Sequence, residues 1–256
     1  MAERVAIIQA RTGSSRLPGK VMYPLGGRPV LANVVSRVNK ADEIDTTVIA
    51  TSEERQDDII TQFAFSYSTE VYRGSESNVL ERFYRASIRY EPDYLVRITA
   101  DCPLIDPIVI DAVVKTLCES SADYATNILN RSFPRGFDIE AFTMETFETV
   151  RDNATSSHDI EHVTPYYREN PDCFELENVT SEEVYSKPYL RDRTDLRLTL
   201  DEAADYELLK KVYRGVDYVD TLPVEDAIAY IDKHNLKEIN AEVEQKKVSD
   251  ASDNPS

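Results

Sequence analysis

A run of small and basic residues near the N-terminus carries the clearest chemical signal in the sequence. Residues 9–20 read QARTGSSRLPGK. In such a loop, Gly13 and Gly19 let the backbone bend toward a ligand. Exposed backbone N–H groups and the hydroxyls of Ser14 and Ser15 can bond phosphate oxygens. These residue types and their spacing predict a loop that holds phosphate.

Three cations in the same run strengthen that prediction. Arg11, Arg16 and Lys20 bring positive charge to a chain whose formal net charge is −18. A triphosphate needs such a set. The loop is not a Walker loop, because five residues separate Gly13 from the Gly-Lys pair, and the G-x-G-x-x-G fingerprint is absent. The alternative is a surface loop whose basic residues pair with local acids.

Two aspartates follow other predicted strands. Asp101 comes just after the apolar run at 94–99, and Asp201 follows the run at 196–200. Mg²⁺ in proteins is commonly held by one or two carboxylates together with phosphate oxygens. We therefore predict that Asp101 and Asp201 converge beside the 9–20 loop and bind Mg²⁺. Alternatively, each carboxylate caps a helix that begins nearby.

The elements that must position these residues alternate between strands and helices. Short β-branched runs predict strands, and apolar residues at helical spacing predict helices. Strands are expected at 5–10, 46–51, 70–72, 94–99, 137–143 and 196–200, and helices at 29–38, 54–65, 78–90, 107–118, 203–213 and 224–234. This order predicts an α/β fold, with helices flanking a mostly parallel central sheet. We expect a single domain over residues 1–240 and a disordered acidic tail over 241–256.

The 9–20 string resembles the signature of the cytidylyltransferases that make CMP-activated sugars, a family that includes the CMP-Kdo and CMP-acylneuraminate synthetases. The chain is most similar to the branch of the spore coat polysaccharide biosynthesis protein F. Two positions depart from that branch, which often has Asp where Asn78 stands and Arg where Ile160 stands. The resemblance extends over about residues 5–231, with further matches at 73–75, 78–83, 97–104, 136–140, 161–164 and 197–201.

The resemblance implies a nucleotide-diphosphosugar transferase (Rossmann-like) fold, a Mg²⁺ ion and a homodimer. It implies a reaction in which CMP passes from CTP to a sugar, such as a 2-keto acid sugar, and pyrophosphate leaves. Such an enzyme would serve the synthesis of surface polysaccharide or glycan. In this reading Arg11, Arg16, Lys20 and Asp101 are the catalytic residues.

Further contacts to both substrates follow from the same resemblance. The residues expected to contact the nucleotide are Ala10, Arg11, Gly13, Ser14, Ser15, Arg16, Lys20, Ser75, Arg82, Thr99 and Ala100. Asp138, Glu140 and His162 are expected to face the sugar. For Ser75, Arg82 and these three residues, the alternative is an ordinary place on a strand or helix surface.

A second motif points to a different chemistry. Residues 158–162 read HDIEH, which matches the H-x-x-E-H pattern of one class of zinc peptidases. The match is short, the third ligand is unidentified, and Pro165 limits the helix that would carry it. We therefore assign His162 to the sugar site rather than to zinc.

Composition narrows the remaining classes of protein. The acidic balance argues against nonspecific nucleic-acid binding, which needs a basic surface. It is expected of a halophilic protein in a high-salt cytoplasm, or of an ordinary acidic protein with an acidic tail. The N-terminus lacks signal-peptide features, no apolar run is long enough for a membrane helix, and three cysteines form no CxxC pair. We therefore expect a cytoplasmic protein without a membrane partner.

Two further functions stay open on the sequence alone. A glycosyltransferase that consumes a nucleotide sugar can share this fold, but it would use an Asp-x-Asp pair, and Asp101 is followed by Cys102 and Pro103. A catalytically silent nucleotide-binding regulator is the other alternative. Such a regulator would be expected to lose Arg16, Lys20 or Asp101, and all three are present.

Overall fold

Alternating side chains place the first strand at the centre of the molecule. In the computed structural model, which describes residues 2–244, β1 runs from Arg4 to Gln9. Its Ala6 and Ile8 enter one hydrophobic cluster, and its Val5 and Ile7 enter another. Because successive side chains of a strand point to opposite faces, β1 is buried on both sides. Helices must therefore cover both faces of the sheet.

Seven strands form the central sheet in the order β5-β4-β1-β6-β8-β7-β9. β5, β4, β1 and β6 pair in parallel, β8 runs antiparallel to β6 and β7, and β9 is parallel to β7. The bounds are β4 Thr46–Ser52, β5 Glu70–Gly74, β6 Tyr94–Thr99, β7 Tyr124–Thr126, β8 Glu140–Thr143 and β9 Leu176–Asn178. The mostly parallel sheet is confirmed. The strand order reverses between β1 and β6, and such a reversal is where open α/β sheets bind ligands.

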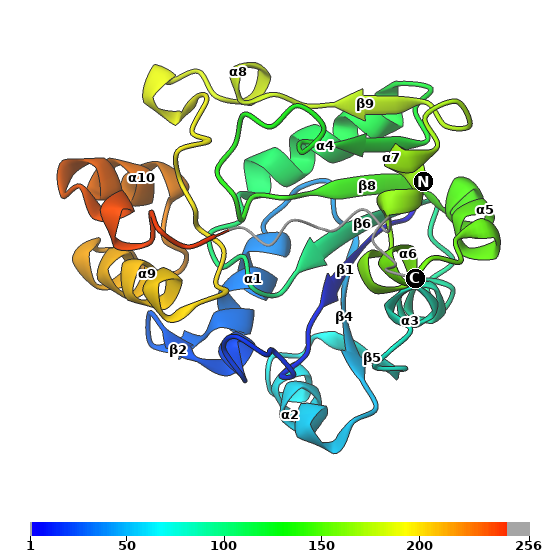
Figure 1. The fold of residues 1–256 in the computed structure, drawn as a ribbon, viewed down its shortest axis with the longest axis horizontal. Helices are drawn as coiled ribbons and strands as arrows, with labels where there is room; N and C mark the ends of the chain where they lie inside the picture. Colours follow the sequence, from blue (N-terminus) through cyan, green and yellow to red (C-terminus); the bar gives the residue numbers. More distant parts are fainter. Residues whose placement is uncertain (1, 245–256) are drawn as a thin grey trace, which may run out of the picture.

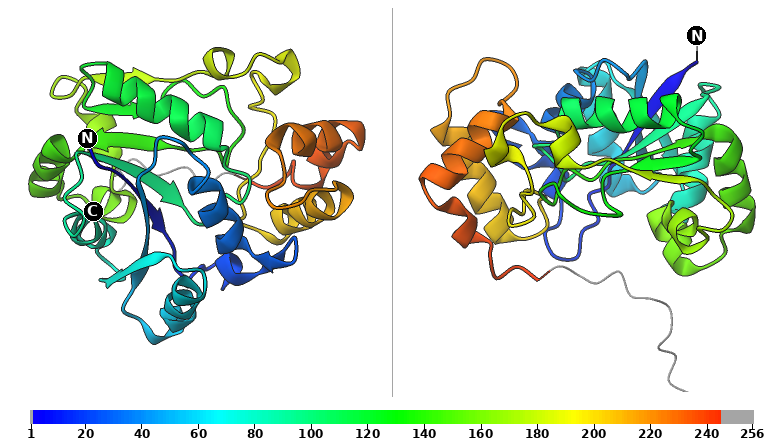
Figure 2. Two further views of the ribbon diagram at one scale, coloured as in Figure 1. Left: turned by 180° about the vertical axis from the view of Figure 1, so that it is seen from behind. Right: turned by 90° about the horizontal axis from the view of Figure 1, so that it is seen from above.

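Helices lie on both faces of the sheet (Figures 1 and 2). The cluster with Ala6 and Ile8 includes residues of α1, α2, α4, α9 and α10, whereas the cluster with Val5 and Ile7 includes residues of α3, α5 and α7. The α-helices are α1 Val30–Val38, α2 Asp58–Ser66, α3 Val79–Ser87, α4 Pro107–Glu119, α5 Met144–Asn153, α6 Ser157–His162, α7 Pro165–Glu169, α8 Ser181–Val184, α9 Ala203–Gly215 and α10 Val224–Lys233.

Short elements join these layers. Lys20–Met22 forms the 3₁₀ turn η1, and a two-stranded hairpin follows it, with β2 at Pro24–Leu25 and β3 at Arg28–Pro29. Three further 3₁₀ turns are η2 Arg55–Asp57, η3 Pro188–Leu190 and η4 Leu236–Ile239. The expected helix at 54–65 is therefore η2 followed by α2. Asn78 caps α3, since its side chain accepts from the Glu81 N–H at 2.8 Å.

The predicted strand at 196–200 is wrong. This segment makes only an isolated bridge between Arg135 and Arg197, so it does not extend the sheet. The strand expected at 137–143 begins only at Glu140. The two segments cross closely at Gly136, whose φ is +101° and where an added Cβ would lie 2.6 Å from the Thr199 nitrogen. A close crossing of two backbones takes the place of a ladder here, and only glycine fits it.

The sequence also left several elements unassigned. The short strands β7 and β9 and the helices α5 to α8 all lie between 124 and 184, where periodicity is weak. Residues 245–256 of the predicted acidic tail lie outside the described residues. Among residues 2–244, every helix is too short or too polar to cross a bilayer.

Candidate functional site

A cavity of about 370 Å³ opens at the carboxyl ends of β1 and β6. This position is the reversal of strand order described above. The 9–20 loop forms one wall, and Thr99 to Asp101 form another. The lining residues are Gln9, Arg11, Gly13, Ser14, Ser15, Arg16, Lys20, Val21, Val79, Arg82, Arg97, Thr99, Ala100, Asp101, Glu161, His162 and Asp201.

The loop is held in shape by its own backbone and by one buried carboxylate. The Thr12 carbonyl accepts from the N–H groups of Ser14 at 2.9 Å and of Gly19 at 2.8 Å. Asp57, which is fully buried, accepts from the Thr12 N–H at 2.7 Å and from its hydroxyl at 2.6 Å. Gly19 has a φ of +72°, which requires the conformational freedom that the sequence predicted for it. Gly13 has no such positive φ.

Lys20 lies between the two aspartates. Its Nζ is 2.6 Å from Asp101 Oδ2 and 2.8 Å from Asp201 Oδ1. Each carboxylate oxygen is within hydrogen-bonding distance of one nitrogen, so the two aspartates converge even though they are 100 positions apart in the sequence. Lys20 is itself buried, being 9% exposed. It therefore belongs to the wall of the cavity rather than to a mobile loop.

This ion triad shifts the pKa of Lys20 and of Asp101. Burial alone would raise the pKa of Asp101, but the adjacent Lys20 ammonium outweighs burial and lowers it. Burial would lower the pKa of Lys20, and the charges of Asp101 and Asp201 outweigh that effect and raise it. Lys20 and Asp101 are therefore both charged at neutral pH. A cation between two carboxylates relieves the repulsion that they would otherwise exert on each other.

Asp201 receives two further cations. Its Oδ1 is 3.0 Å from Arg16 Nη2, and its Oδ2 is 2.7 Å from Arg197 Nη2. Asp201 does not cap α9: Glu202 is the N-cap, in a capping box with Asp205. Asp101 does not cap α4 either, because Asp106 fills that position. The two carboxylates predicted to bind metal are thus free of the capping roles that were the alternative.

The backbone brings these carboxylates together. The Leu200 N–H donates to the Asp101 carbonyl at 2.8 Å, and the Leu198 N–H donates to the Arg135 carbonyl at 2.7 Å. The segment before Asp201 is thereby held beside the end of β6. A few backbone hydrogen bonds achieve what the sequence had assigned to a strand.

Arg82 is the most deeply buried arginine in the cavity wall. It is 3% exposed, one guanidinium nitrogen donates to the Ser75 carbonyl at 2.7 Å, and its Nε has no hydrogen-bond partner among the described residues. Burial, with the nearby charge of Arg11, lowers the pKa of Arg82 to about 10. A buried cation with unused donors is suited to an anionic or carbonyl-bearing ligand. Ser75 does not line the cavity, and it supports Arg82 from behind.

Glu140 lies behind the cavity and not on its surface. It is 2% exposed and accepts hydrogen bonds from Tyr124, Thr164 and Arg168, and it also pairs with Arg97. Burial would raise the pKa of Glu140, but Arg97 and Arg168 outweigh burial and lower it to about 2. Arg97, in turn, lines the cavity. Glu140 thus orients a residue that a ligand can reach.

Of the other two residues expected to face the sugar, His162 lines the cavity and Asp138 does not. His162, at the end of α6, lines the cavity together with Glu161, which lies 3.8 Å from Arg11. Burial, together with the charge of Arg97, lowers the pKa of His162 and favours the neutral imidazole. Asp138 is outside the lining and pairs with Arg131 through contacts of 2.6 Å and 2.9 Å.

The structure therefore brings most of the predicted nucleotide residues to one cavity. Thr99 and Ala100 line it, whereas Ala10 is buried at the end of β1 and donates its N–H to the Ala50 carbonyl. Sequence reasoning missed Asp57 and left Arg97 and Glu161 without a role, although both lie inside matched motifs. The apolar wall residues Val21 and Val79 and the polar Gln9 were also missed, because periodicity alone marks them as ordinary core or strand positions.

Comparison with known proteins gives the family of the chain. Residues 5–247 match the family model of the cytidylyltransferases. The spore coat polysaccharide biosynthesis protein SpsF of Bacillus subtilis (strain 168) is 35% identical over 219 residues, which cover 84% of this chain and 88% of that protein.

Two further similarities are to a solved structure and to a relative that is named for its sugar substrate. A cytidylyltransferase from Leptospira borgpetersenii serovar Hardjo-bovis (strain JB197) superposes with a TM-score of 0.85 and 31% identity, over 96% of this chain and 100% of that one. The 3-deoxy-manno-octulosonate cytidylyltransferase of Geotalea daltonii is 32% identical over 117 residues, covering 46% of each chain. The match to the family model spans nearly the whole sequence, and the chain therefore belongs to the cytidylyltransferase family.

Proposed function

We propose that this protein transfers CMP from CTP to a hydroxyl of a sugar, releasing pyrophosphate, and that the product serves the synthesis of surface polysaccharide or glycan. The observation that carries the proposal is the convergence of Lys20, Asp101 and Asp201 in the wall of a cavity that four arginines also line. Five cations and three carboxylates line this cavity in a chain of net charge −18. A local excess of positive charge there favours a polyanion such as CTP.

The reaction is an in-line attack of the sugar hydroxyl on the α-phosphorus of CTP. Because no covalent enzyme intermediate is required, the residues act by positioning and by neutralising charge. Arg11, Arg16 and Lys20 hold the β- and γ-phosphates and stabilise the charge that develops on the leaving pyrophosphate. Arg82, with unused donors in the wall, faces the rest of the nucleotide. Ser14 and Ser15 add hydroxyl contacts from the loop.

The pair of carboxylates fits a Mg²⁺ site. Asp101 and Asp201 approach within reach of one cation, and carboxylate oxygens combined with phosphate oxygens are the ligands that Mg²⁺ prefers. Mg²⁺ bound there supplies charge neutralisation and a lower pKa for the attacking hydroxyl. Lys20 serves as the cation between these carboxylates in the free protein. Its Nζ is then the group that moves toward the phosphates when nucleotide binds.

The sugar end of the cavity favours an acidic acceptor. Arg97 lies there with a buried Nε that has no partner among residues 2–244, close to the neutral His162. A guanidinium pairs well with a carboxylate, so we propose a 2-keto acid sugar or a related acidic sugar as acceptor. The relative from Geotalea daltonii is named for 3-deoxy-manno-octulosonate, which supports this class. His162 and Glu161 contact the acceptor, and Glu140 acts through Arg97.

The test is a substrate matrix. The full-length protein is incubated with each of the four ribonucleoside triphosphates, with Mg²⁺ and with a panel of 2-keto acid and aldose sugars, and pyrophosphate release is measured. We expect release with CTP and a keto-acid sugar. Preference for a purine triphosphate would contradict CMP transfer, and consumption of a ready-made nucleotide sugar without pyrophosphate would identify a glycosyltransferase. A nucleotide-binding regulator would bind CTP and release nothing.

By the same family resemblance we propose a homodimer, which light scattering will test.

Replacing Asp101 by asparagine should separate the metal's contribution from folding. The variant keeps the shape of the side chain and loses one of the two charges that face Lys20. We expect Mg²⁺-dependent turnover to fall by about 10²–10³-fold, as for loss of one charged contact to a transition state. Thermal unfolding should shift little, and Asp172→Asn, on an exposed loop, serves as the matched control. Unchanged dependence of the rate on Mg²⁺ would contradict the assignment.

A further inference from the structure

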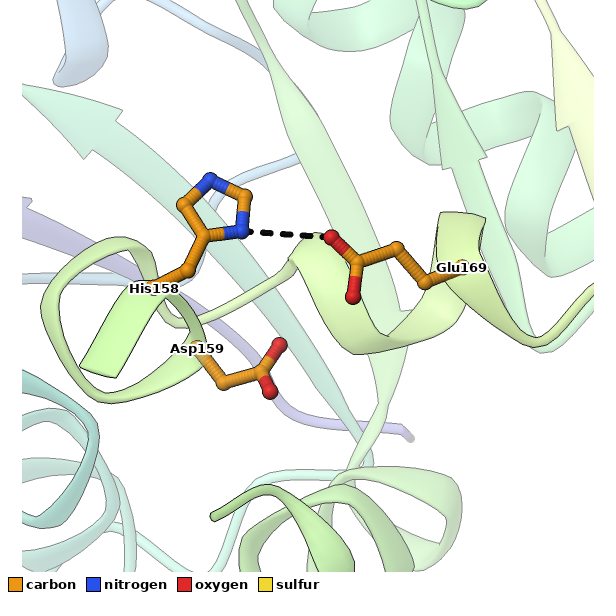
Figure 3. A group of neighbouring side chains, drawn as sticks. All are labelled: His158, Asp159 and Glu169. Atoms are coloured by element: carbon orange, nitrogen blue, oxygen red, sulfur yellow. Dashed lines mark hydrogen bonds and ion pairs between the residues drawn. The ribbon is translucent and has the colours of Figure 1, made fainter. Parts of the chain in front are cut away.

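Three ligand-bearing side chains meet outside the nucleotide cavity, between α6 and α7 (Figure 3). They are His158 and Asp159 from α6 and Glu169 from the end of α7. His158 Nδ1 lies 3.2 Å from Glu169 Oε1, and the three residues each offer one ligand atom within 4.8 Å of the others. This is the only group of at least three His, Cys, Asp or Glu side chains in the described part of the chain that meets that condition.

Two polar atoms of this cluster are buried without a partner. Asp159 is 4% exposed, and although its Oδ2 accepts from the Ser156 hydroxyl at 2.6 Å, its Oδ1 has no hydrogen-bond partner among residues 2–244. His158 Nε2 is likewise buried and unpaired within that range. A buried carboxylate oxygen without a partner is costly. A cation bound in the cluster would give the unpaired carboxylate oxygen of Asp159 a partner.

The backbone between the two helices is shaped to make this meeting possible. Val163, which links α6 to α7, has φ 74° and ψ −49°. A β-branched residue rarely adopts this conformation, and such strain is usually maintained where it serves a purpose. The sharp turn brings α7 back along α6, so that Glu169 faces His158 (Figure 3).

We propose that His158, Asp159 and Glu169 form a structural site for Zn²⁺ or a similar first-row divalent ion, distinct from the Asp101–Asp201 pair. One imidazole nitrogen and two carboxylate oxygens are ligands that Zn²⁺ accepts, with water as the fourth. A tetrahedral ion with bonds of about 2.1 Å holds its ligand atoms about 3.4 Å apart. His158 Nδ1 and Glu169 Oε1 are already close to that spacing, and the half-exposed Glu169 side chain has room to adjust around an ion.

The cluster uses only the first histidine of the H-x-x-E-H pattern. Glu161 turns toward Arg11, and His162 lines the nucleotide cavity, so neither belongs to the cluster. An ion held by His158, Asp159 and Glu169 would instead fasten α6 to α7. The last turn of α6 carries Glu161 and His162, so the ion would steady the wall that faces the acceptor.

The test is metal binding by the full-length, metal-free protein in the absence of nucleotide and Mg²⁺. Zn²⁺ is titrated calorimetrically and through its effect on Tm, and Co²⁺ provides an absorption spectrum that reports a nitrogen and oxygen ligand set. We expect the wild-type protein to bind Zn²⁺ with a rise in Tm, and His158→Ala and Glu169→Gln to bind at least about 10-fold more weakly. His234→Ala and Glu148→Gln are matched controls that should bind as the wild type does.

A comparison with Asp101→Asn separates this site from the nucleotide site. That variant should keep the Zn²⁺-dependent rise in Tm, whatever its activity. If His158→Ala fails to fold, Glu169→Gln decides, because its side chain is 52% exposed. Equal Zn²⁺ affinity and an equal Tm shift in wild type and Glu169→Gln would overturn the proposal, and the cluster would then be an ordinary ion pair. Neither outcome depends on CMP transfer.

Discussion

Lys20→Met is expected to lower kcat by about 10²–10³-fold, because in the proposed reaction it removes a charge that stabilises the leaving pyrophosphate in the transition state. Methionine retains the apolar stem of the side chain, which matters because Lys20 is 9% exposed. The loss leaves Asp101 and Asp201 facing each other without the ammonium between them. We therefore expect Tm to fall in metal-free buffer and to recover when Mg²⁺ is added.

Two measurements test this expectation together. Pyrophosphate release under saturating CTP gives kcat, and thermal unfolding with and without Mg²⁺ gives the effect on the carboxylate pair. Lys20→Arg retains the charge and should keep a larger share of both quantities. A near-normal kcat for Lys20→Met would contradict a role of Lys20 in the reaction. A Tm that does not change with Mg²⁺ would contradict Mg²⁺ binding by Asp101 and Asp201.

Glu140→Gln is expected to lower the free energy of unfolding by about 3–5 kcal/mol, the usual result of removing one partner from a buried ion pair. Glu140 is 2% exposed and lies between Arg97 and Arg168. Glutamine keeps the size of the side chain but leaves two partly buried guanidinium groups without their shared counter-charge. Chemical denaturation at pH 7 measures the loss, and Glu148→Gln, at an exposed position of α5, is the control.

The same carboxylate predicts how stability depends on pH. The pKa of Glu140 is lowered from an ordinary 4.5 to about 2, so the unfolded chain binds its proton more readily than the folded one. The contribution of Glu140 is therefore complete above pH 4.5 and is lost as the pH falls to about 2. The free energy of unfolding should fall less steeply over that window in Glu140→Gln than in the wild type. Parallel curves for the two proteins would contradict the ionised state assigned to Glu140.

The parallel part of the sheet and the helices between its strands were predictable, because local sequence patterns there agree with the tertiary structure. The β-branched runs of β1, β4 and β6 are buried on both faces, and periodic helices separate β1 from β4 and β6 from β8. The region from 124 to 200 was harder. Its strands have three or four residues, and a backbone crossing at Gly136 replaces the expected strand at 196–200. Such a crossing depends on the packing of two distant segments and leaves no periodicity.

The site shows the same division. Lys20 and Asp101 could be placed together, because the 9–20 loop and Asp101 follow β1 and β6 at one edge of the sheet. Asp201 was placed there through a strand at 196–200 that does not form. The sugar end could not, because Glu140 and Asp138 lie in a strand and a loop whose facing depends on register. A one-residue change of register exchanges the buried and exposed faces of a strand. Glu140 therefore holds Arg97 from within the core, a role that no spacing in the sequence distinguishes from a surface carboxylate.

The hydrogen bond from the Leu200 N–H to the Asp101 carbonyl has a consequence for how this enzyme can diverge. Every residue type except proline supplies the same main-chain donor and acceptor, so most substitutions nearby alter charge and volume without removing this hydrogen bond. The wall made by α6 is attached differently, through side chains such as Arg11 and Glu161. The phosphate end of the cavity should therefore keep its geometry when residues change, whereas the acceptor end should change shape with its side chains. Directed evolution toward a new acceptor sugar should accumulate changes in residues 157–169 while residues 9–20 stay unaltered.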